Sequence, residues 1–540
     1  MAFGLLLVGA LAIVGCSNTE EGTDRIDEEA TEEIELESDW EAHYTTGINQ
    51  ELIDDHSNRY EEILEDFHNS DYTFENPLII QDPYDRAPLT ALVLFETDNP
   101  LEITVTVEGQ TEETTISHTY TGFETKHEIP VLGLYPDFEN NVTLTGRTET
   151  GEIIEEEFVM ITDTLPDNML DFTLVTSHPE MMQEGLTFLS PSNSNPSGID
   201  SNGDVRWYSS ARSSNNFKRI ENGHLLMATQ EEGAEDFNHI TETDMLGRVY
   251  QSIFIDLDNI VYSSPLHHDI IILPNDNYLA LTHDGSEEYI EDEVVELDRE
   301  TGEVVHRINL KDVFPREMYE EYEGHQDEYG DWAHVNALWK LQDEEAILLS
   351  VRQHDMIIKL TYPEGEIDWV FSYPEDREDG LEEYLLESVD ENLKYPAGQH
   401  AVLEMPDQDG NEDTLDIMLF DNNRIFKYGD EDLDTEYSRG VHYRINQEEN
   451  TVEEIWSYGE ERGTELYTNV VSNAAYFPET ENVLMNFGRT LNEEAQERYS
   501  VITEVTKTDN PEVVYELHYG PYDADAWRQI YRAERFSLYP

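Results

Sequence analysis

The chain has 540 residues, and 121 acidic against 30 basic side chains give it a formal net charge of -91 at pH 7. A surface this acidic repels phosphate backbones and anionic membrane surfaces, which excludes nucleic acid as a partner of the general surface. It also opposes anionic substrates unless a local site supplies positive charge. Such acidity is typical of proteins that work at high salt, where screening weakens the repulsion between carboxylates.

Residues 1–16 have the features of a lipoprotein signal peptide. The run from Met1 to Val14 is apolar but too short for an ordinary membrane-spanning helix, and it ends just before Cys16, the only cysteine. We expect Cys16 to carry a lipid that anchors the protein to the extracytoplasmic side of a membrane, at the cell surface or in the periplasm. A plain secretory signal or a buried free thiol are the alternatives.

The composition and the pattern of apolar residues change along residues 17–165. Residues 17–38 are acidic and polar, which predicts a disordered tether. Residues 39–72 contain INQELIDDHSNRYEEILEDF, an amphipathic pattern that predicts a helical segment. Residues 73–165 alternate apolar and polar side chains between Gly, Pro and Asn, which predicts a small immunoglobulin-like β-sandwich.

Residues 166–540 repeat a loose unit of about 40 to 60 residues. Hairpins such as HDIIILPNDNYLALT and VVELDRETGEVVHRI combine into four-stranded antiparallel blades, and about six units follow one another. The predicted fold class is therefore all-β, with a six-bladed β-propeller preceded by the sandwich domain.

Histidines lead three of these units, at His267 and His268, at His334 and at His400. The innermost strand of each propeller blade lines the central channel, so residues at the start of those strands gather at one mouth. A single strand histidine is more often structural. The same placement in three consecutive blades predicts an active site.

The chemistry of this cluster follows from its partners. Asn336 shares a strand face with His334, because side chains alternate with a period of two, and Arg352 lies in the next strand of that blade. Imidazole, amide and guanidinium together suit a tetrahedral oxyanion such as sulfate or phosphate. Zinc bound by the histidines and Asp269 is the competing interpretation, which the arginine disfavours. We expect the acidic stretch 407–413 to be a solvated loop rather than a calcium site.

These motifs resemble those of the bacterial arylsulfate sulfotransferases, from about Asn76 to the C-terminus. The resemblance rests on NPLIIQDPYDRAPLTALVLFET in the first domain and, in the second, on the HHDI segment, the His-x-Asn and Arg pattern and His400. It implies a six-bladed propeller that moves a sulfuryl group from a phenolic sulfate ester to a phenol through a sulfohistidine, by a ping-pong mechanism. No nucleotide sulfate donor, metal or other cofactor is expected, and a homodimer is possible.

The resemblance also implies roles for single residues. His400 would be the nucleophile, and the sulfuryl oxygens and the proton would be handled by His334, Asn336, Arg352 and His268. Further substrate contacts are expected from His267, Thr490 and Arg489. Some relatives carry a disulfide near the nucleophile, which a chain with one cysteine lacks. Two other functions fit the sequence: a non-catalytic propeller lipoprotein that binds a ligand or a protein, and a sulfatase-like hydrolase.

Overall fold

The computed structural model describes residues 40–540, apart from 170, 193, 235, 259–263, 287–288, 323–329, 376, 378, 430–436, 493–494 and 524–527. The chain divides into two units, Met1–Glu35 and Leu36–Pro540, and every described residue lies in the second. The predicted signal peptide, the lipidated Cys16 and the tether 17–38 lie outside the described residues and stay predictions. Within the described residues, no helix is long and apolar enough to cross a membrane.

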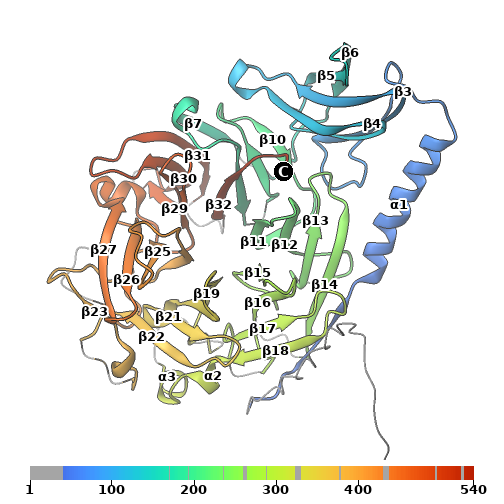
Figure 1. Ribbon diagram of the computed structural model, residues 1–540. Helices are drawn as coiled ribbons and strands as arrows, with labels where there is room; N and C mark the ends of the chain where they lie inside the picture. Colours follow the sequence, from blue (N-terminus) through green and yellow to red (C-terminus); the bar gives the residue numbers. More distant parts are fainter. Residues whose placement is uncertain are drawn as a thin grey trace, which may run out of the picture. The chain divides into compact units, whose positions relative to one another are not determined.

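Six antiparallel sheets follow one another along the larger domain and surround a central axis (Figure 1). Each sheet is a blade of four main strands, with an extra outer strand on three of them. From the innermost strand outward, the blades are β32 (Ile530–Phe536), β8 (Leu186–Pro191), β9 (Ser197–Ile199) and β10 (Val205–Tyr208); β11 (Ser213–Arg219), β12 (Leu225–Thr229), β13 (His239–Thr243) and β14 (Val249–Leu257); β15 (Ile270–Ile272), β16 (Tyr278–Thr282), β17 (Glu293–Leu297) and β18 (Val304–Asn309); β19 (Val335–Lys340), β20 (Ala346–Val351), β21 (Met356–Thr361) and β22 (Ile367–Ser372); β24 (His400–Glu404), β25 (Thr414–Asp421), β26 (Arg439–Asn446) and β27 (Thr451–Tyr458); and β28 (Asn473–Phe477), β29 (Asn482–Asn492), β30 (Glu497–Thr506) and β31 (Val513–Asp523).

The two ends of this domain close the ring of blades. The C-terminal strand β32 pairs with β8 in the first blade, and β7 (Phe172–Ser177) pairs with β31 at the outer edge of the last blade. Each blade alone would leave an apolar face and open strand edges exposed to water. These two pairs place segments from opposite ends of the domain in the first and last blades, which ties its ends together.

The smaller domain is a five-stranded antiparallel sheet of β2 (Leu78–Gln81), β3 (Thr90–Val107), β4 (Ile116–Leu132), β5 (Glu139–Thr148) and β6 (Ile153–Ile161). The long strands β3 and β4 pair along most of their length, with a register shift between Glu96 and Leu101. This shift lets the first half of β3 pair with β2 and the second half with β5. The predicted immunoglobulin-like domain is therefore built around the paired strands β3 and β4, and β3 joins its two halves.

A buried arginine joins this domain to the first blade. The guanidinium of Arg206, in β10, donates to the carbonyl oxygens of Gly133 (2.8 Å) and Thr114 (2.7 Å) and pairs with Asp200 (3.1 Å). It also lies over the ring of Tyr135, 3.8 Å from the centroid. Because a buried charge is tolerated only with such partners, these contacts fix one domain against the other.

The predicted helical segment 39–72 is only partly helical. Helix α1 (Gln50–His68) begins after Asn49, whose side chain accepts a hydrogen bond from the Leu52 N–H. Before it, however, β1 (Tyr44–Ile48) is a strand that pairs with β14 at the outer edge of the second blade. The unpaired backbone groups of that edge favour an added strand over a further helical turn. The short helices α2 (Leu310–Val313) and α3 (Glu317–Glu320) lie between the third and fourth blades, and β23 (Glu387–Ser388) pairs with β27.

A buried ion pair across the ring closure yields a first prediction. Arg535 of β32 and Glu504 of β30 are both fully buried, with 2.6 Å between Nη1 and Oε2. Glu504→Ala leaves the guanidinium charge uncompensated and should cost about 3–5 kcal/mol of stability. The measurement is the midpoint of chemical unfolding. The control is Glu102→Ala, whose partner Arg147 is 48% exposed, and which should cost less than about 1 kcal/mol. Equal midpoints for the two variants would contradict the role of the closure pair.

Candidate active site

The inner strands of three consecutive blades bring the predicted histidines to the central channel. His267 and His268 immediately precede the β15 segment, His334 precedes β19 and His400 opens β24. The ring centroids of His268 and His334 lie 4.8 Å apart; His268 is buried and His334 is half-buried. The structure therefore brings His268 and His334 together, and His400 lies near enough to Arg352 and His334 for their charges to lower its pKa.

The backbone at this mouth is distorted in every one of the six inner strands. Left-handed φ angles occur at Asn215, His268, His334 and Ala401, and also before β28 at Val471 (φ 55°) and Ser472 (φ 93°). In β32 the pairing register shifts between Ile530 and Arg532. Such conformations cost free energy for residues other than glycine, most of all for β-branched Val471, and they re-aim side chains. They turn the ends of the strands toward a common point.

The surroundings of His400 fix its tautomer. The Asn422 amide nitrogen donates to the carbonyl oxygens of Thr468 (2.9 Å) and Val471 (3.1 Å), which leaves its Oδ1 facing His400 Nδ1 at 2.6 Å. Since Asn422 Oδ1 and the Gly398 oxygen (3.1 Å) can only accept, Nδ1 carries the hydrogen. The lone pair of neutral His400 is therefore on Nε2, which accepts from the Val471 N–H at 3.2 Å.

His334 faces two carboxylates. Its Nδ1 lies 2.8 Å from Asp331 Oδ2 and 2.8 Å from Glu291 Oε2. Asp331 is held in turn by the Gln353 amide, 3.1 Å from the same oxygen. Two buried carboxylates on one ring nitrogen favour an imidazolium at His334, with its other N–H directed away from them.

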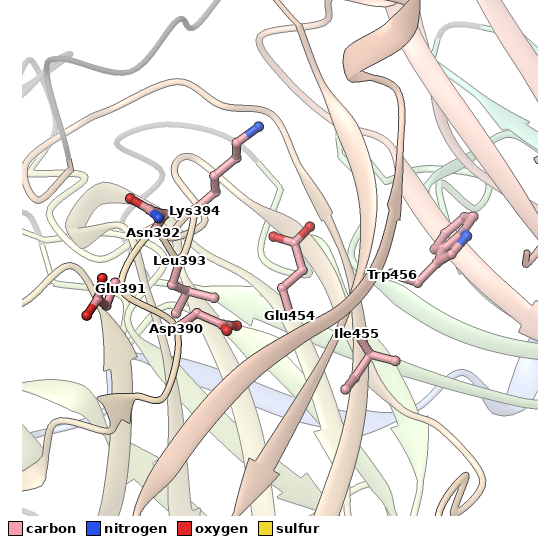
Figure 2. Close-up of a pocket in the computed structure, with 8 residues that line it drawn as sticks. All are labelled: Asp390, Glu391, Asn392, Leu393, Lys394, Glu454, Ile455 and Trp456. Carbon is pink, nitrogen blue, oxygen red and sulfur yellow. The ribbon is translucent and has the colours of Figure 1, made fainter. Parts of the chain in front are cut away.

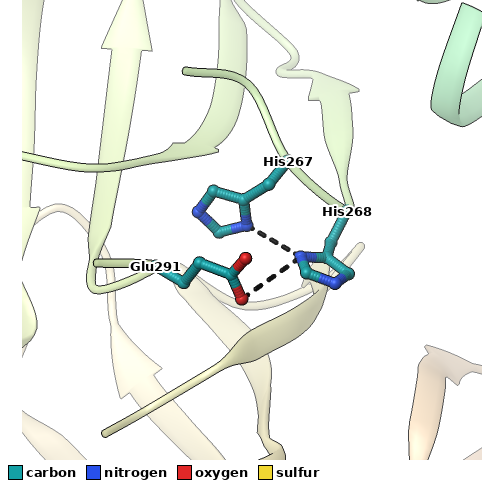
Figure 3. Close-up of side chains that lie close together, drawn as sticks. All are labelled: His267, His268 and Glu291. Carbon is teal, nitrogen blue, oxygen red and sulfur yellow. Dashed lines mark hydrogen bonds and ion pairs between the residues drawn. The ribbon is translucent and has the colours of Figure 1, made fainter. Parts of the chain in front are cut away.

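His267 and His268 form a chain of hydrogen bonds (Figure 3). His267 Nε2 lies 3.1 Å from the Thr282 carbonyl oxygen, so it donates, and its Nδ1 is left as an acceptor. His268 Nδ1, 2.9 Å away, then carries the hydrogen between the two rings. The lone pair of neutral His268 is consequently on Nε2, the nitrogen that points away from Glu291. His268 therefore presents a base, and His267 supports it.

Asn336 and Arg352 are the remaining residues that the sequence predicted beside the histidines. Asn336 lies in a bulge of β19, and its amide donates to the Gln399 carbonyl oxygen at 2.8 Å, beside His400. The Arg352 N–H donates to the His334 carbonyl oxygen (3.3 Å), and the guanidinium stacks 4.2 Å from the Phe426 ring centroid. Among the described residues no carboxylate forms an ion pair with Arg352, although the group is buried. A buried guanidinium without a bound carboxylate suits an anionic ligand.

Two predicted substrate contacts lie outside this cluster. Thr490 is in β29, the second strand of the last blade, and its hydroxyl donates to the Tyr499 carbonyl oxygen at 3.1 Å. Within the described part of the chain, no hydrogen bond joins it to the histidines. The pKa of Arg489 is lowered by burial and by Arg498, which places it near that arginine and Tyr522. Both roles stay predictions.

Both domains match known family models. The arylsulfotransferase (ASST) model matches residues 172–532, and the arylsulfotransferase Ig-like domain model matches residues 78–163. The chain belongs to the arylsulfotransferase family. It is 24% identical over 514 residues to the arylsulfate sulfotransferase AssT of Escherichia coli O6:H1 (strain CFT073), which covers 76% of this chain and 85% of the relative. It is 22% identical over 497 residues to AssT of Lelliottia amnigena, covering 74% of this chain and 82% of that one.

Among solved structures, the arylsulfotransferase resembles a putative 6-phosphogluconolactonase from Bacteroides fragilis with 9% identity. The match covers 82% of this chain and 99% of the other, at a TM-score of 0.32. A likeness this weak adds nothing to the family assignment.

The three central imidazoles of this arylsulfotransferase differ in charge. Burial, Arg352 and the neighbouring His334 hold the pKa of His400 well below its usual range, and burial does the same for His268. Burial alone would also lower the pKa of His334, but the carboxylates of Asp331 and Glu291 raise it to about 9. At neutral pH the site therefore holds one imidazolium between two neutral imidazoles.

Two groups of side chains have spacings that a metal ion could use: His267, His268 and Glu291, and Glu291, Asp331 and His334. In both groups the nitrogens that face the carboxylates already take part in the hydrogen bonds described above. Arg352 also raises the cost of a further cation, since its charge lowers the pKa of His334. The ring nitrogens and carboxylates of both groups are thus engaged with one another by hydrogen bonds and ion pairs.

A separate pocket of about 350 Å³ lies at the outer edge of the fifth blade (Figure 2). Its walls come from the segment between β23 and β24 and from strand β27, with Asp390, Glu391, Asn392, Leu393, Lys394, Glu454, Ile455 and Trp456. The histidines of the candidate active site lie at the starts of innermost strands, whereas this pocket is at the outer edge of a blade. The pocket is therefore separate from the candidate active site of the arylsulfotransferase.

Several residues of the site were not found from the sequence. Asn422 directly follows β25, the second strand of the blade that His400 opens, as Arg352 follows β20, and this shared position could have identified it. Glu291 lies on the loop between β16 and β17, and no motif marked it. Tyr531, whose hydroxyl donates to the Asn336 carbonyl oxygen (3.0 Å), comes from the closing strand β32. Asp331 lies three residues before His334, and the D-x-x-H spacing is a signal that could have identified it.

The pKa of His334 gives a second prediction. In the unfolded chain this pKa is near 6.5, so a folded value of about 9 stabilises the protein fully below pH 6.5, and the contribution is lost as the pH rises through 9. The stability difference between wild type and His334→Gln should therefore shrink by up to about 3 kcal/mol between pH 6.5 and 9.5. Unfolding midpoints over this range measure it. His306→Gln is the control, because burial lowers the pKa of His306 and its contribution is flat there. A constant difference for His334→Gln would disprove the imidazolium.

Proposed function

We propose that this arylsulfotransferase transfers a sulfuryl group from a phenolic sulfate ester to a phenol by a ping-pong mechanism, through a sulfohistidine at His400. The observation that carries the proposal is the tautomer of His400. Asn422 and Gly398 hold the hydrogen on Nδ1, so a neutral nucleophilic lone pair stands on Nε2 among Arg352 and His334. The name of the relatives, arylsulfate sulfotransferase, agrees with this chemistry.

In the first half-reaction, His400 Nε2 attacks the sulfur of the ester in line with the departing oxygen. The nitrogen–sulfur bond forms as the bond from sulfur to the phenolate oxygen breaks. The hydrogen bond from the Val471 N–H to Nε2 breaks as the lone pair attacks, and this N–H and Arg352 then stabilise the charge on the sulfuryl oxygens, as in phosphoryl transfer. His334, the imidazolium, gives its outer proton to the phenolate, which leaves as a neutral phenol.

The second half-reaction reverses these steps with another phenol. The acceptor hydroxyl gives its proton to the neutral His334, which reverses the proton transfer of the first half-reaction. The phenol oxygen forms a bond to sulfur, and the nitrogen–sulfur bond returns its electron pair to His400. His334 is again an imidazolium, so each turnover conserves protons and requires no nucleotide donor or other cofactor.

Two other functions are tested by the same assay. A sulfatase-like hydrolase would use water in place of the acceptor phenol. A propeller that only binds a ligand would leave a sulfate ester intact. The cluster of one imidazolium, two neutral imidazoles and a buried guanidinium favours transfer, because a binding site does not require opposite proton states.

A third prediction concerns the covalent intermediate. Incubation with 4-nitrophenyl sulfate alone should add one sulfuryl group to the wild-type chain, labile in acid, and steady release of nitrophenolate should require added phenol. His400→Ala should show neither, with a loss of activity of at least about 10⁴-fold. Intact mass and absorbance measure both. The matched control is His442→Ala, a buried histidine of the same blade that pairs with Asp416. Steady release without phenol would indicate a hydrolase, and an active His400→Ala enzyme would reject this nucleophile.

The net charge yields a fourth prediction. At -91 the chain repels an anionic ester at long range, whereas contacts within the buried site are screened little. The value of kcat/KM for the ester should therefore rise as salt increases from about 0.05 to 1 M, with less change in kcat. Steady-state rates over that range provide the measurement. A fall of kcat/KM with salt would show that a local positive field dominates the approach of the substrate.

A further inference from the structure

We propose that Glu291 is a positioning residue of the transfer reaction, whose carboxylate keeps the proton on His334. The inference rests on the proposed function and extends it to a residue that contacts no substrate. It explains how two neighbouring histidines acquire opposite roles.

The carboxylate of Glu291 lies between the two imidazoles. Its Oε2 is 2.8 Å from His334 Nδ1 and 3.8 Å from His268 Nδ1, so the inner nitrogens of both rings face one oxygen. The side chain is buried. The contact with His334 is an ion pair that favours a proton on its Nδ1, whereas 3.8 Å is too long for a hydrogen bond to His268. The hydrogen on His268 Nδ1 is directed to His267 (Figure 3).

The backbone of Glu291 is anchored as firmly as its side chain. Its N–H donates to His283 Nδ1 at 2.6 Å, and its carbonyl oxygen accepts from the Val335 N–H at 3.4 Å. The residue adopts a left-handed conformation, with φ at 56°. A strained backbone held by the third blade on one side and the fourth on the other places the carboxylate at the junction of both histidines.

The charges around His334 make the carboxylate necessary. Asp331 and Glu291 are negative, Arg352 is positive, and His268 and His400 are kept neutral by burial. The set is electrically neutral only when His334 carries a proton. The burial of Glu291 would raise its pKa, but His334 and His268 hold it well below its usual range, so the carboxylate stays ionised.

The neighbouring acids do not replace Glu291. Asp284 and Asp292 both bind Lys311, whose ammonium is fully buried between them. Glu293, two residues along the same segment, pairs with Arg307 at 3.0 Å. Within the described residues, Glu291 and Asp331 are thus the carboxylates in ion-pair range of His334.

The test compares two donors that differ in their need for an acid. Nitrophenolate is a stable leaving group, whereas the phenolate of phenyl sulfate needs a proton from His334. In Glu291→Gln, formation of the sulfo-enzyme from phenyl sulfate should fall about a hundredfold, and from 4-nitrophenyl sulfate less than about tenfold. The basic limb of the phenyl sulfate pH profile should move down by about one to two pH units. Rapid-mixing mass measurement of the sulfo-enzyme from pH 6 to 10 follows both.

Glu293→Gln is the matched control, since it is the same substitution on a buried glutamate that faces Arg307 instead of the histidines. It should keep the wild-type ratio between the two donors and the wild-type pH profile. Thermal unfolding shows whether each variant is folded. If Glu291→Gln does not fold, Glu291→Asp retains the charge at a greater distance and should shift the donor ratio in the same direction by a smaller factor.

The outcomes separate the two proposals. Wild-type enzyme that forms no sulfo-adduct from either donor refutes the proposed function itself. An active wild type, together with a Glu291→Gln variant that keeps the wild-type donor ratio and pH profile, overturns the role of Glu291. A stoichiometric metal ion in purified wild type that is absent from Glu291→Gln also overturns it, because the carboxylate would then be a ligand.

Discussion

A single buried carboxylate connects most of the inner strands. Asp269, directly after His268, accepts from Lys218 of β11 (2.5 Å), from Arg532 of β32 (3.1 and 2.6 Å) and from the Leu338 N–H of β19 (3.1 Å). A buried anion is tolerated only when such partners are in place. These partners come from the first, second and fourth blades, so the charge of Asp269 is satisfied only when the ring of blades is closed. The closed ring in turn fixes the position of the neighbouring His268.

The same residue type performs three tasks because its surroundings differ. His400 faces an amide oxygen and a carbonyl oxygen, and burial keeps it neutral. His334 faces two carboxylates and is charged. His268 lies between another imidazole and a more distant carboxylate, and it stays neutral with its lone pair outward. The roles proposed for these histidines therefore depend on the acceptor atoms behind the rings. In a chain of net charge -91, the positive groups of the site are enclosed and separated from the acidic surface.

Much of the architecture could be predicted, because strand hairpins and their turns leave a local signal. The six blades, the β-rich first domain and the placement of His268, His334 and His400 on inner strands all follow from repeated apolar runs. The strand β1 within the predicted helical segment was missed, since its stability comes from the free edge of β14 rather than from its own sequence. The resemblance implied a substrate contact for Thr490, whose hydroxyl donates to the Tyr499 carbonyl oxygen within the last blade.

The sequence by itself determined the repeat, the family resemblance and the set of residues that reach the channel, because these depend on side-chain periodicity and short motifs. Only the tertiary structure decided which nitrogen of each histidine carries a hydrogen and which ring is charged. Those properties depend on burial and on groups such as Glu291 and Asn422, which the chain brings to the site from other loops. The left-handed backbone conformations at the ends of the inner strands were also decided only by the tertiary structure, because contacts between blades hold them in place.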